Sequence, residues 1–168
     1  MNAIDEFNKL SRSKFIGIFA NIFEKTKWIA EKLYNQKPFD SFEDLCSKML
    51  RIFETTTKEN QLRILKAHPD LADKATVNSL STNSRAEQSN AGLDLCSKEE
   101  FNEFKNLNDE YKKKFGFPFI LAVGGRNKTE ILNKFKKRIL NTADDEFREA
   151  ISQVCKIANL RLNEINIK

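Results

Sequence analysis

Hydrophobic residues recur at intervals of three and four along most of the chain, which is the spacing of one face of an α-helix. In the first half, this pattern predicts helices at about 13–23 and 26–34, followed by two more that begin after Ser41 and Thr57. Ser and Thr at these two positions are typical N-caps, because their hydroxyl oxygens accept hydrogen bonds from free backbone N–H groups. The last of these helices must end near His68, because Pro69 follows it.

The second half continues the helical pattern after a break. Residues 70–83 are small and polar, which predicts a loop that holds about one helical turn. Two capping-box patterns follow, Ser84-Arg85-Ala86-Glu87 and Ser97-Lys98-Glu99-Glu100, and each predicts a helix start. The first of these helices is expected to end near Gly92 and the second before Gly116. Residues 117–123 are apolar but not periodic, so they are predicted to be irregular or extended. Helices near 129–140 and 143–165 complete the chain.

The pattern as a whole predicts an all-α fold, with residues 1–168 forming a single compact multi-helix domain. The chain has 168 residues, 40% of them hydrophobic, which is enough for one sizeable core. It has only five glycines and three prolines, fewer than the turns of an all-β sandwich or barrel normally use. The longest uncharged run, residues 115–125, is too short to span a bilayer, and the first residues do not resemble a signal peptide.

Charge and cysteine content exclude several classes of function. The net charge is +5, but the lysines are scattered, whereas a nucleic-acid-binding protein would concentrate them on one face. We therefore expect neither a nucleic-acid nor a membrane partner. Cys46, Cys96 and Cys155 are far apart and form no C-x-x-C pair, so neither a metal site nor a disulfide framework is indicated. We expect a reducing compartment, with all three thiols buried as small hydrophobic groups.

Two polar residues stand where the local pattern does not call for them. Arg161 falls on the apolar stripe of the last predicted helix, so it must be paired or must face a cavity that holds an anion or a carbonyl. The structural alternatives are a buried ion pair or a side chain that extends its charged end to solvent. His68, the only histidine, lies at a helix C-terminus. An imidazole there can titrate near neutral pH and serve as a general base, or it can simply cap the last carbonyls.

Two further segments also allow two interpretations. The capping box accounts for Ser84 and Glu87 without any substrate, yet a helix N-terminus also offers free N–H groups to an anionic or carbonyl ligand, and Gln88 adds an amide. The backbone of residues 117–125 lacks helical partners. It could bind a ligand or pair with neighbouring helices.

Five short motifs, in order, resemble one known family. They are His68-Pro69-Asp70-Leu71-Ala72, Ser84-x-x-Glu87-Gln88, Ala91-Gly92-Leu93, the segment from Tyr111 to Ile120 that contains Lys114-Phe115-Gly116-Phe117-Pro118-Phe119-Ile120, and Lys156-Ile157-Ala158-x-x-Arg161-Leu162. Together they resemble the OHCU decarboxylases of urate degradation, which convert 2-oxo-4-hydroxy-4-carboxy-5-ureidoimidazoline (OHCU) to (S)-allantoin. The likeness extends to Trp28-Ile29-Ala30. Lys37-Pro38-Phe39 departs from it, since family members often have Arg-Pro-Phe there.

The resemblance implies an all-helical homodimer that needs no metal or organic cofactor. The last three residues given, Asn166-Ile167-Lys168, do not resemble a peroxisomal Ser-Lys-Leu tail, so we expect a cytoplasmic location. The resemblance places the catalytic residues at His68, Glu87 and Arg161. The substrate-binding positions that it implies are Pro69, Ser84, Arg85, Ala86 and Gln88, with the backbone of Phe119, Ile120, Leu121, Ala122 and Val123. Two alternatives remain open at this point. His68-Pro69-Asp70 is also the tripeptide of J-domain co-chaperones, although no J-domain start precedes it, and the same fold could act on another small ureido or imidazoline acid.

Overall fold

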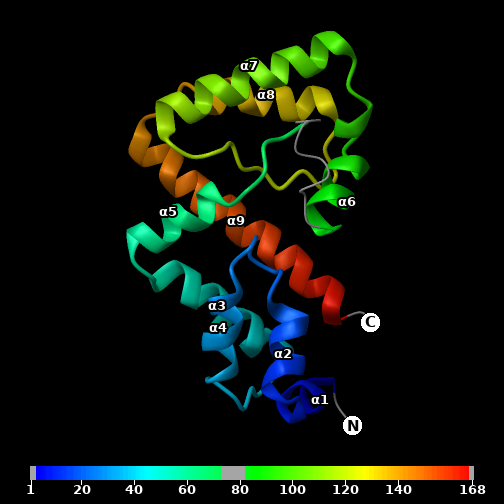
Figure 1. Ribbon diagram of the computed structural model, residues 1–168, viewed down its shortest axis with the longest axis vertical. Coiled ribbons are helices and arrows are strands. Elements are labelled where there is room, and N and C mark those ends of the chain that lie inside the picture. Colours follow the sequence, from blue (N-terminus) through cyan, green and yellow to red (C-terminus); the bar gives the residue numbers. More distant parts are fainter. Residues whose placement is uncertain (1–2, 73–81, 167–168) are drawn as a thin grey trace. The chain divides into compact units, whose positions relative to one another are not determined.

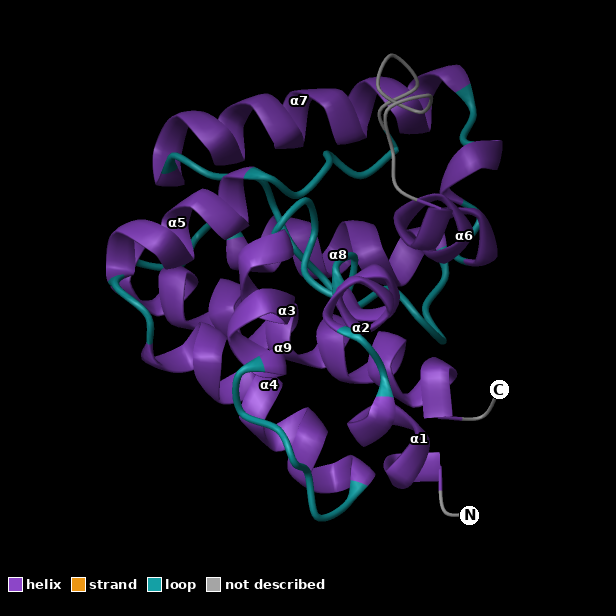
Figure 2. Ribbon diagram, turned by 60° about the horizontal axis from the view of Figure 1, so that its bottom comes forward, coloured by secondary structure: helices purple, strands orange, loops and turns teal. Residues whose placement is uncertain are grey.

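The computed structural model describes residues 3–72 and 82–166, and everything described in them is helix, turn or loop (Figures 1 and 2). No strand occurs in these two ranges, so the predicted all-α fold is confirmed. No helix among the described residues is both long and apolar enough to cross a bilayer. The chain divides into two compact units, one made of residues 1–64 and 155–168 and the other of residues 65–154.

The first unit contains the N-terminal helices. These are α1 (Ala3–Lys9), α2 (Arg12–Phe19), α3 (Lys27–Tyr34), α4 (Phe42–Thr55) and most of α5 (Lys58–Lys66). Ser41 and Thr57 cap α4 and α5 as predicted, since their hydroxyls accept the backbone N–H of Asp44 at 3.0 Å and of Asn60 at 3.2 Å. The core is aromatic: the Phe15 ring lies 4.6 Å from that of Phe19.

The second unit contains α6 (Thr82–Asn90), a 3₁₀ turn (Leu93–Leu95), α7 (Lys98–Phe115) and α8 (Lys128–Arg138). Helices α7 and α8 lie side by side (Figure 1). The capping box of Ser97 and Glu100 forms as predicted, and Gly116 ends α7 in the left-handed conformation at φ 80°. The last helix, α9 (Ala143–Asn166), begins in this unit and ends in the first.

The aromatic core of the second unit surrounds the segment between α7 and α8. Phe119 of this segment stacks on Phe135 with ring centroids 3.9 Å apart, and Tyr111 meets both rings edge-on. Residues 117–123 have no helical or strand hydrogen-bond pattern, as the sequence predicted.

The cysteines only partly follow the prediction. Cys46 and Cys96 are buried, but Cys155 is half-buried, so the expectation of three buried thiols is wrong for one of them. Burial, with a smaller effect of Glu43, raises the pKa of Cys46 to about 11. Burial and the nearby Glu54 carboxylate raise that of Cys155 to about 12. Both thiols are therefore protonated and unreactive near neutral pH.

Candidate active site

His68 lies two residues beyond the end of α5, as the sequence predicted. Its backbone N–H donates to the Leu65 carbonyl at 3.2 Å, and the residue is 9% exposed. The helix ends there because Pro69 cannot continue its hydrogen-bond pattern. An imidazole in this position is held close to the negative end of the α5 dipole, with little contact with solvent.

Ser84, Glu87 and Gln88 share one face of α6, because residues three and four apart are neighbours on a helix. Ser84 and Gln88 are buried and Glu87 is half-buried, whereas Ala86 is exposed. The Arg85 side chain lies outside the described residues. The predicted capping box at Ser84 and Glu87 is wrong: α6 begins at Thr82, so both residues lie inside the helix. Local capping therefore does not explain why these polar residues face inward.

The Gln88 amide connects α6 to the chain just after His68 and Pro69. Its Oε1 accepts the backbone N–H of Ala72 at 3.1 Å, and its Nε2 donates to the Asp70 carbonyl at 3.4 Å. Gln88 thus contacts residues 70 and 72, which follow the predicted catalytic His68 by two and four positions in the sequence. Because these contacts engage both ends of the amide, Gln88 helps to shape the loop in addition to any contact with a ligand.

The extended segment at 119–123 is buried except at the half-buried Ala122, and three side chains hold its backbone. Arg138 Nη1 donates to the Ile120 carbonyl at 2.6 Å, Gln153 Oε1 accepts the Ala122 N–H at 3.0 Å, and Arg126 Nε donates to the Ala122 carbonyl at 3.3 Å. The alternative in which these backbone groups pair with neighbouring elements is therefore realised for the Ile120 carbonyl and for both backbone groups of Ala122.

Leu121, at the centre of this segment, is one of the residues here, with Phe119, whose backbone groups have no partner within the described residues. It is buried, and its backbone N–H and carbonyl hydrogen-bond to nothing within the described residues. Buried backbone groups are nearly always paired. Those of Leu121 therefore offer one donor and one acceptor that a ring amide or ureido group can bind.

A buried ionic network behind this segment was missed from the sequence. Glu146 is fully buried and accepts hydrogen bonds from the Arg138 guanidinium and, at 2.6 Å, from the Tyr111 hydroxyl. Arg138 also lies over the Phe119 ring, 4.4 Å from its centroid. Burial and the Glu146 carboxylate raise the pKa of Tyr111 far above its usual value, so its hydroxyl remains a donor. The network fixes the Ile120 carbonyl and thus the course of the segment.

Arg161 is buried, as its place on the apolar stripe predicted, and it has an acidic partner that the sequence did not reveal. Its Nη1 lies 3.3 Å from Glu24 Oε2 and donates to the Ile22 carbonyl at 3.1 Å. The side chains of Arg161 and Glu24 are 3% and 1% exposed. These residues belong to the first unit, whereas His68, α6 and the 119–123 segment belong to the second. The structural alternative for Arg161, a buried ion pair, is therefore realised.

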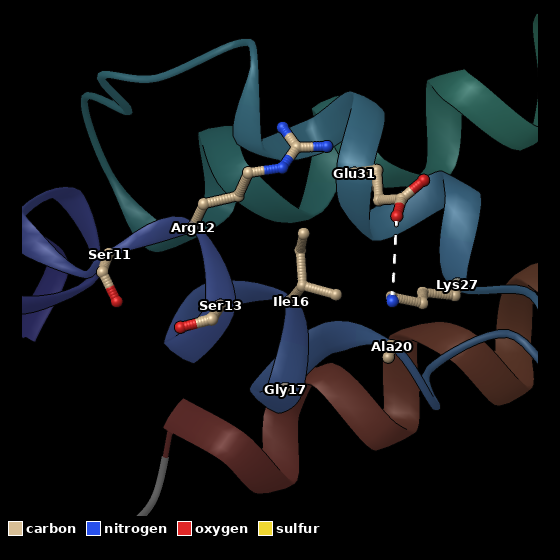
Figure 3. A pocket seen from close by; sticks show the side chains of 8 residues that line it. All are labelled: Ser11, Arg12, Ser13, Ile16, Gly17, Ala20, Lys27 and Glu31. Carbon is tan, nitrogen blue, oxygen red and sulfur yellow. Dashed lines mark ion pairs between the residues drawn. The ribbon is translucent and has the colours of Figure 1, made fainter.

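A groove of about 680 Å³ in the first unit contains none of the predicted site residues. Figure 3 shows its lining: Arg12 and Ile16 of α2 face Lys27 and Glu31 of α3, which form an ion pair at 3.9 Å. Gly17 contributes to the floor. In residues 3–72 and 82–166, no group of three His, Cys, Asp or Glu side chains is arranged to hold a metal ion.

Within the second unit, the predicted residues thus supply an imidazole at His68, a buried hydroxyl at Ser84, a carboxylate at Glu87 and an amide at Gln88. The family model for OHCU decarboxylase matches residues 8–163.

The chain belongs to the OHCU decarboxylase family.

Relatives support this assignment along the whole chain. A 2-oxo-4-hydroxy-4-carboxy-5-ureidoimidazoline decarboxylase from Haloferax volcanii is 37% identical over 161 residues, which cover 96% of this chain and 94% of the relative. The uric acid degradation bifunctional protein of Bacillus sp. (strain TB-90) is 38% identical over 165 residues, but this chain spans only 32% of its length.

Solved structures of similar proteins have the same fold. A crystal structure of (S)-allantoin synthase superposes with a TM-score of 0.76 at 27% identity, covering 96% of this chain and 53% of that one. An OHCU decarboxylase crystallised in the presence of (S)-allantoin gives a TM-score of 0.74 at 24% identity, covering 90% of this chain and 99% of that one. Membership in the OHCU decarboxylase family removes the J-domain alternative, because the match covers both units rather than the short segment around His68.

Proposed function

We propose that this OHCU decarboxylase family member converts OHCU to (S)-allantoin, as a carboxy-lyase that needs no cofactor. One observation carries the proposal: the OHCU decarboxylase model matches residues 8–163, which include His68, Ser84, Glu87, Gln88 and Arg161. Of these side chains, His68, Ser84, Gln88 and Arg161 are buried, and Gln88 and Arg161 also bond to other residues of the chain.

The chemistry of the substrate explains why no cofactor is required. OHCU carries a hydroxyl and a carboxylate on one ring carbon, next to a ring C=N bond. When the bond to the carboxylate breaks, CO₂ leaves and the electron pair forms a C=C bond to the neighbouring carbon. The π electrons of the C=N bond move to nitrogen, which takes up a proton. The product of this step is an enol.

His68 is our candidate for the proton transfer that follows. The imidazole accepts the hydroxyl proton, the ring carbonyl forms, and the neighbouring carbon takes up a proton on one face, which gives a single enantiomer. A general base must lie within about 2.6–3.2 Å of the oxygen that it deprotonates. The cationic imidazole that results is stabilised by the C-terminal end of α5.

The other predicted residues bind and orient the substrate in this proposal. Glu87 accepts hydrogen bonds from ring or ureido N–H groups. Arg161 pairs with a carbonyl or with the oxygen on which negative charge develops, where preorganised charge lowers the barrier most. Ser84, Arg85, Ala86 and Gln88 of α6 and the backbone around Leu121 hold the ring, and Pro69 closes its edge.

Three further expectations stay predictions. We propose that the two units function as one domain, because the family model extends over both. We propose a homodimer, which sedimentation equilibrium would test, and a cytoplasmic location.

The direct test is an activity assay on freshly generated OHCU. We expect conversion to optically active allantoin, at an unchanged rate in the presence of a chelator. If the product is racemic and forms only at the uncatalysed rate, the proposed reaction is wrong. In that case, other small ureido or imidazoline acids should be screened for protection of the protein against thermal unfolding.

A further inference from the structure

The turn that directly follows His68 and Pro69 is held by side chains from two helices. From α7, Asn108 Nδ2 donates to the Leu71 carbonyl at 2.9 Å, and Lys112 Nζ forms an ion pair with Asp70 at 2.6 Å. From α6, the Gln88 amide contacts both ends of the same turn. Residues 70–72 thus receive polar contacts from Gln88, Asn108 and Lys112.

The backbone of this turn would not keep its conformation without such support. Ala72 has a φ of 58°, in the left-handed region that residues with a Cβ rarely adopt. Residues in such conformations persist only where the surrounding contacts over-determine them. The Ala72 N–H is bonded to Gln88, and the carbonyl of the preceding residue to Asn108.

Asn108 is an unfavourable choice for packing alone. It is 3% exposed, and its Oδ1 has no hydrogen-bond partner in the described part of the chain. Leaving a buried acceptor unsatisfied is destabilising, so a leucine of similar volume would fill the same space with less penalty. The Nδ2 group of the Asn108 amide accounts for the presence of an asparagine here, because it donates the hydrogen bond that holds the Leu71 carbonyl.

Part of the space between the turn and α7 is not filled by the described side chains. A cavity of about 120 Å³ lies between them, lined by Asp70 and Ala72 on one side and by Phe101, Lys105 and Asn108 on the other. Where such a space separates two elements, directional polar contacts decide their spacing. The contacts that span it here are those of Asn108 and Lys112.

We propose that Asn108 and Lys112 of α7 are positioning residues for His68. They hold the 70–72 turn, and only Pro69 separates this turn from the imidazole. Because the proline ring fixes its own φ and restricts the backbone of the residue before it, fewer torsions are free between the turn and His68 than in an ordinary segment. The inference rests on the proposed function, in which His68 moves the proton, and neither residue needs to touch the substrate.

The experiment compares variants that remove each contact with variants that preserve it. Asn108→Leu removes the donor to Leu71, and Lys112→Met removes the ion pair with Asp70. Lys112→Arg keeps a cation within reach of Asp70. Lys113→Met is the matched control, because Lys113 is the exposed neighbour on the same helix.

We expect Asn108→Leu to lower kcat by up to about 10²-fold and Lys112→Met by about tenfold, since small misplacements of a catalytic group have effects of this size. KM should change less than about twofold. Lys112→Arg should recover most of the rate, and Lys113→Met should match the wild type. His68 is the only histidine, so its ring signals in the NMR spectrum should move in Asn108→Leu and Lys112→Met but not in Lys113→Met.

Two results would overturn the proposal. One is a wild-type kcat with unmoved His68 ring signals in both Asn108→Leu and Lys112→Met. The other is a loss of rate that only follows the loss of folded protein, as measured by circular dichroism. If Asn108→Leu does not fold, Lys112→Met alone decides, because Lys112 is 41% exposed. The His68 signals also separate this proposal from the proposed reaction. Shifted signals in a chain that does not act on OHCU would support the positioning role and refute the reaction.

Discussion

The buried pair of Arg161 and Glu24 allows the structural and functional roles of the arginine to be separated. Replacing Arg161 with Met removes the cation but leaves the Glu24 carboxylate, 1% exposed, without its charge partner. Breaking a buried pair from one side typically destabilises a protein by about 3–5 kcal/mol. We therefore expect Arg161→Met, and equally Glu24→Leu, to lower the free energy of unfolding by about this amount.

Removing both charges should have a much smaller effect. Arg161→Met combined with Glu24→Leu leaves no buried charge, and such replacements are often neutral or stabilising. If the effects of the two single substitutions simply added, the free energy of unfolding would fall by about 6–10 kcal/mol, which is enough to unfold most domains. If Arg161 binds the substrate, the double variant should be as stable as the wild type and yet inactive.

Urea unfolding followed by circular dichroism, together with turnover of OHCU, measures both quantities. Arg148→Met provides the control on the same helix. Its ion pair with Asp145 has side chains that are 75% and 60% exposed, so its loss should change stability by less than about 1 kcal/mol. The reasoning is refuted if Arg161→Met is as stable as the wild type. It is also refuted if the double variant loses as much free energy of unfolding as the two single variants lose together. A double variant with normal turnover would remove Arg161 from the site.

Three further predictions concern other parts of the chain. Tyr111→Phe removes the buried hydroxyl that donates to Glu146, so urea unfolding should show a loss of about 1.5–3 kcal/mol. The hydrogen bond from the Ser97 backbone N–H lowers the pKa of the Glu100 carboxyl. The ionised carboxylate therefore stabilises the fold above the unfolded pKa of 4.5, and this stabilisation is lost as the pH falls through the lowered pKa. Glu100→Gln should accordingly lower the Tm at pH 7 and change it less at a pH below the lowered pKa. Burial raises the pKa of Cys46 to about 11, so at about pH 8 a thiol reagent should modify it only after unfolding.

The helices could be predicted wherever capping chemistry and apolar spacing agreed. Ser41, Thr57 and the Ser97–Glu100 capping box each lie at the observed helix starts. The same four-residue pattern at Ser84 was misleading, because it lies inside a helix that begins two residues earlier. Short-range sequence cannot distinguish these cases, since the pattern is compatible with both positions. The helix Ala3–Lys9 was missed because it is short and buries only Ile4.

The candidate site shows a similar limit. The spacing of α9 placed Arg161 on the buried stripe, but its partner Glu24 lies 137 residues away in a loop, and nothing local marks it. Glu146 looked like an ordinary acid in the first turn of a helix, where the dipole favours it. Its burial became apparent only when Arg138 and Tyr111 were placed around it. Partners far apart in sequence are decided by tertiary packing, which periodicity does not encode.

The central claim is that this chain makes (S)-allantoin with His68 as its general base. The most direct measurement is the optical activity of the product formed from fresh OHCU by the wild type and by His68→Asn at equal concentrations of folded protein. We predict that the wild type accumulates (S)-allantoin and that His68→Asn, with an unchanged circular dichroism spectrum, loses about 10²–10⁴-fold in rate. If His68→Asn produces (S)-allantoin at the wild-type rate, the account of this site is contradicted.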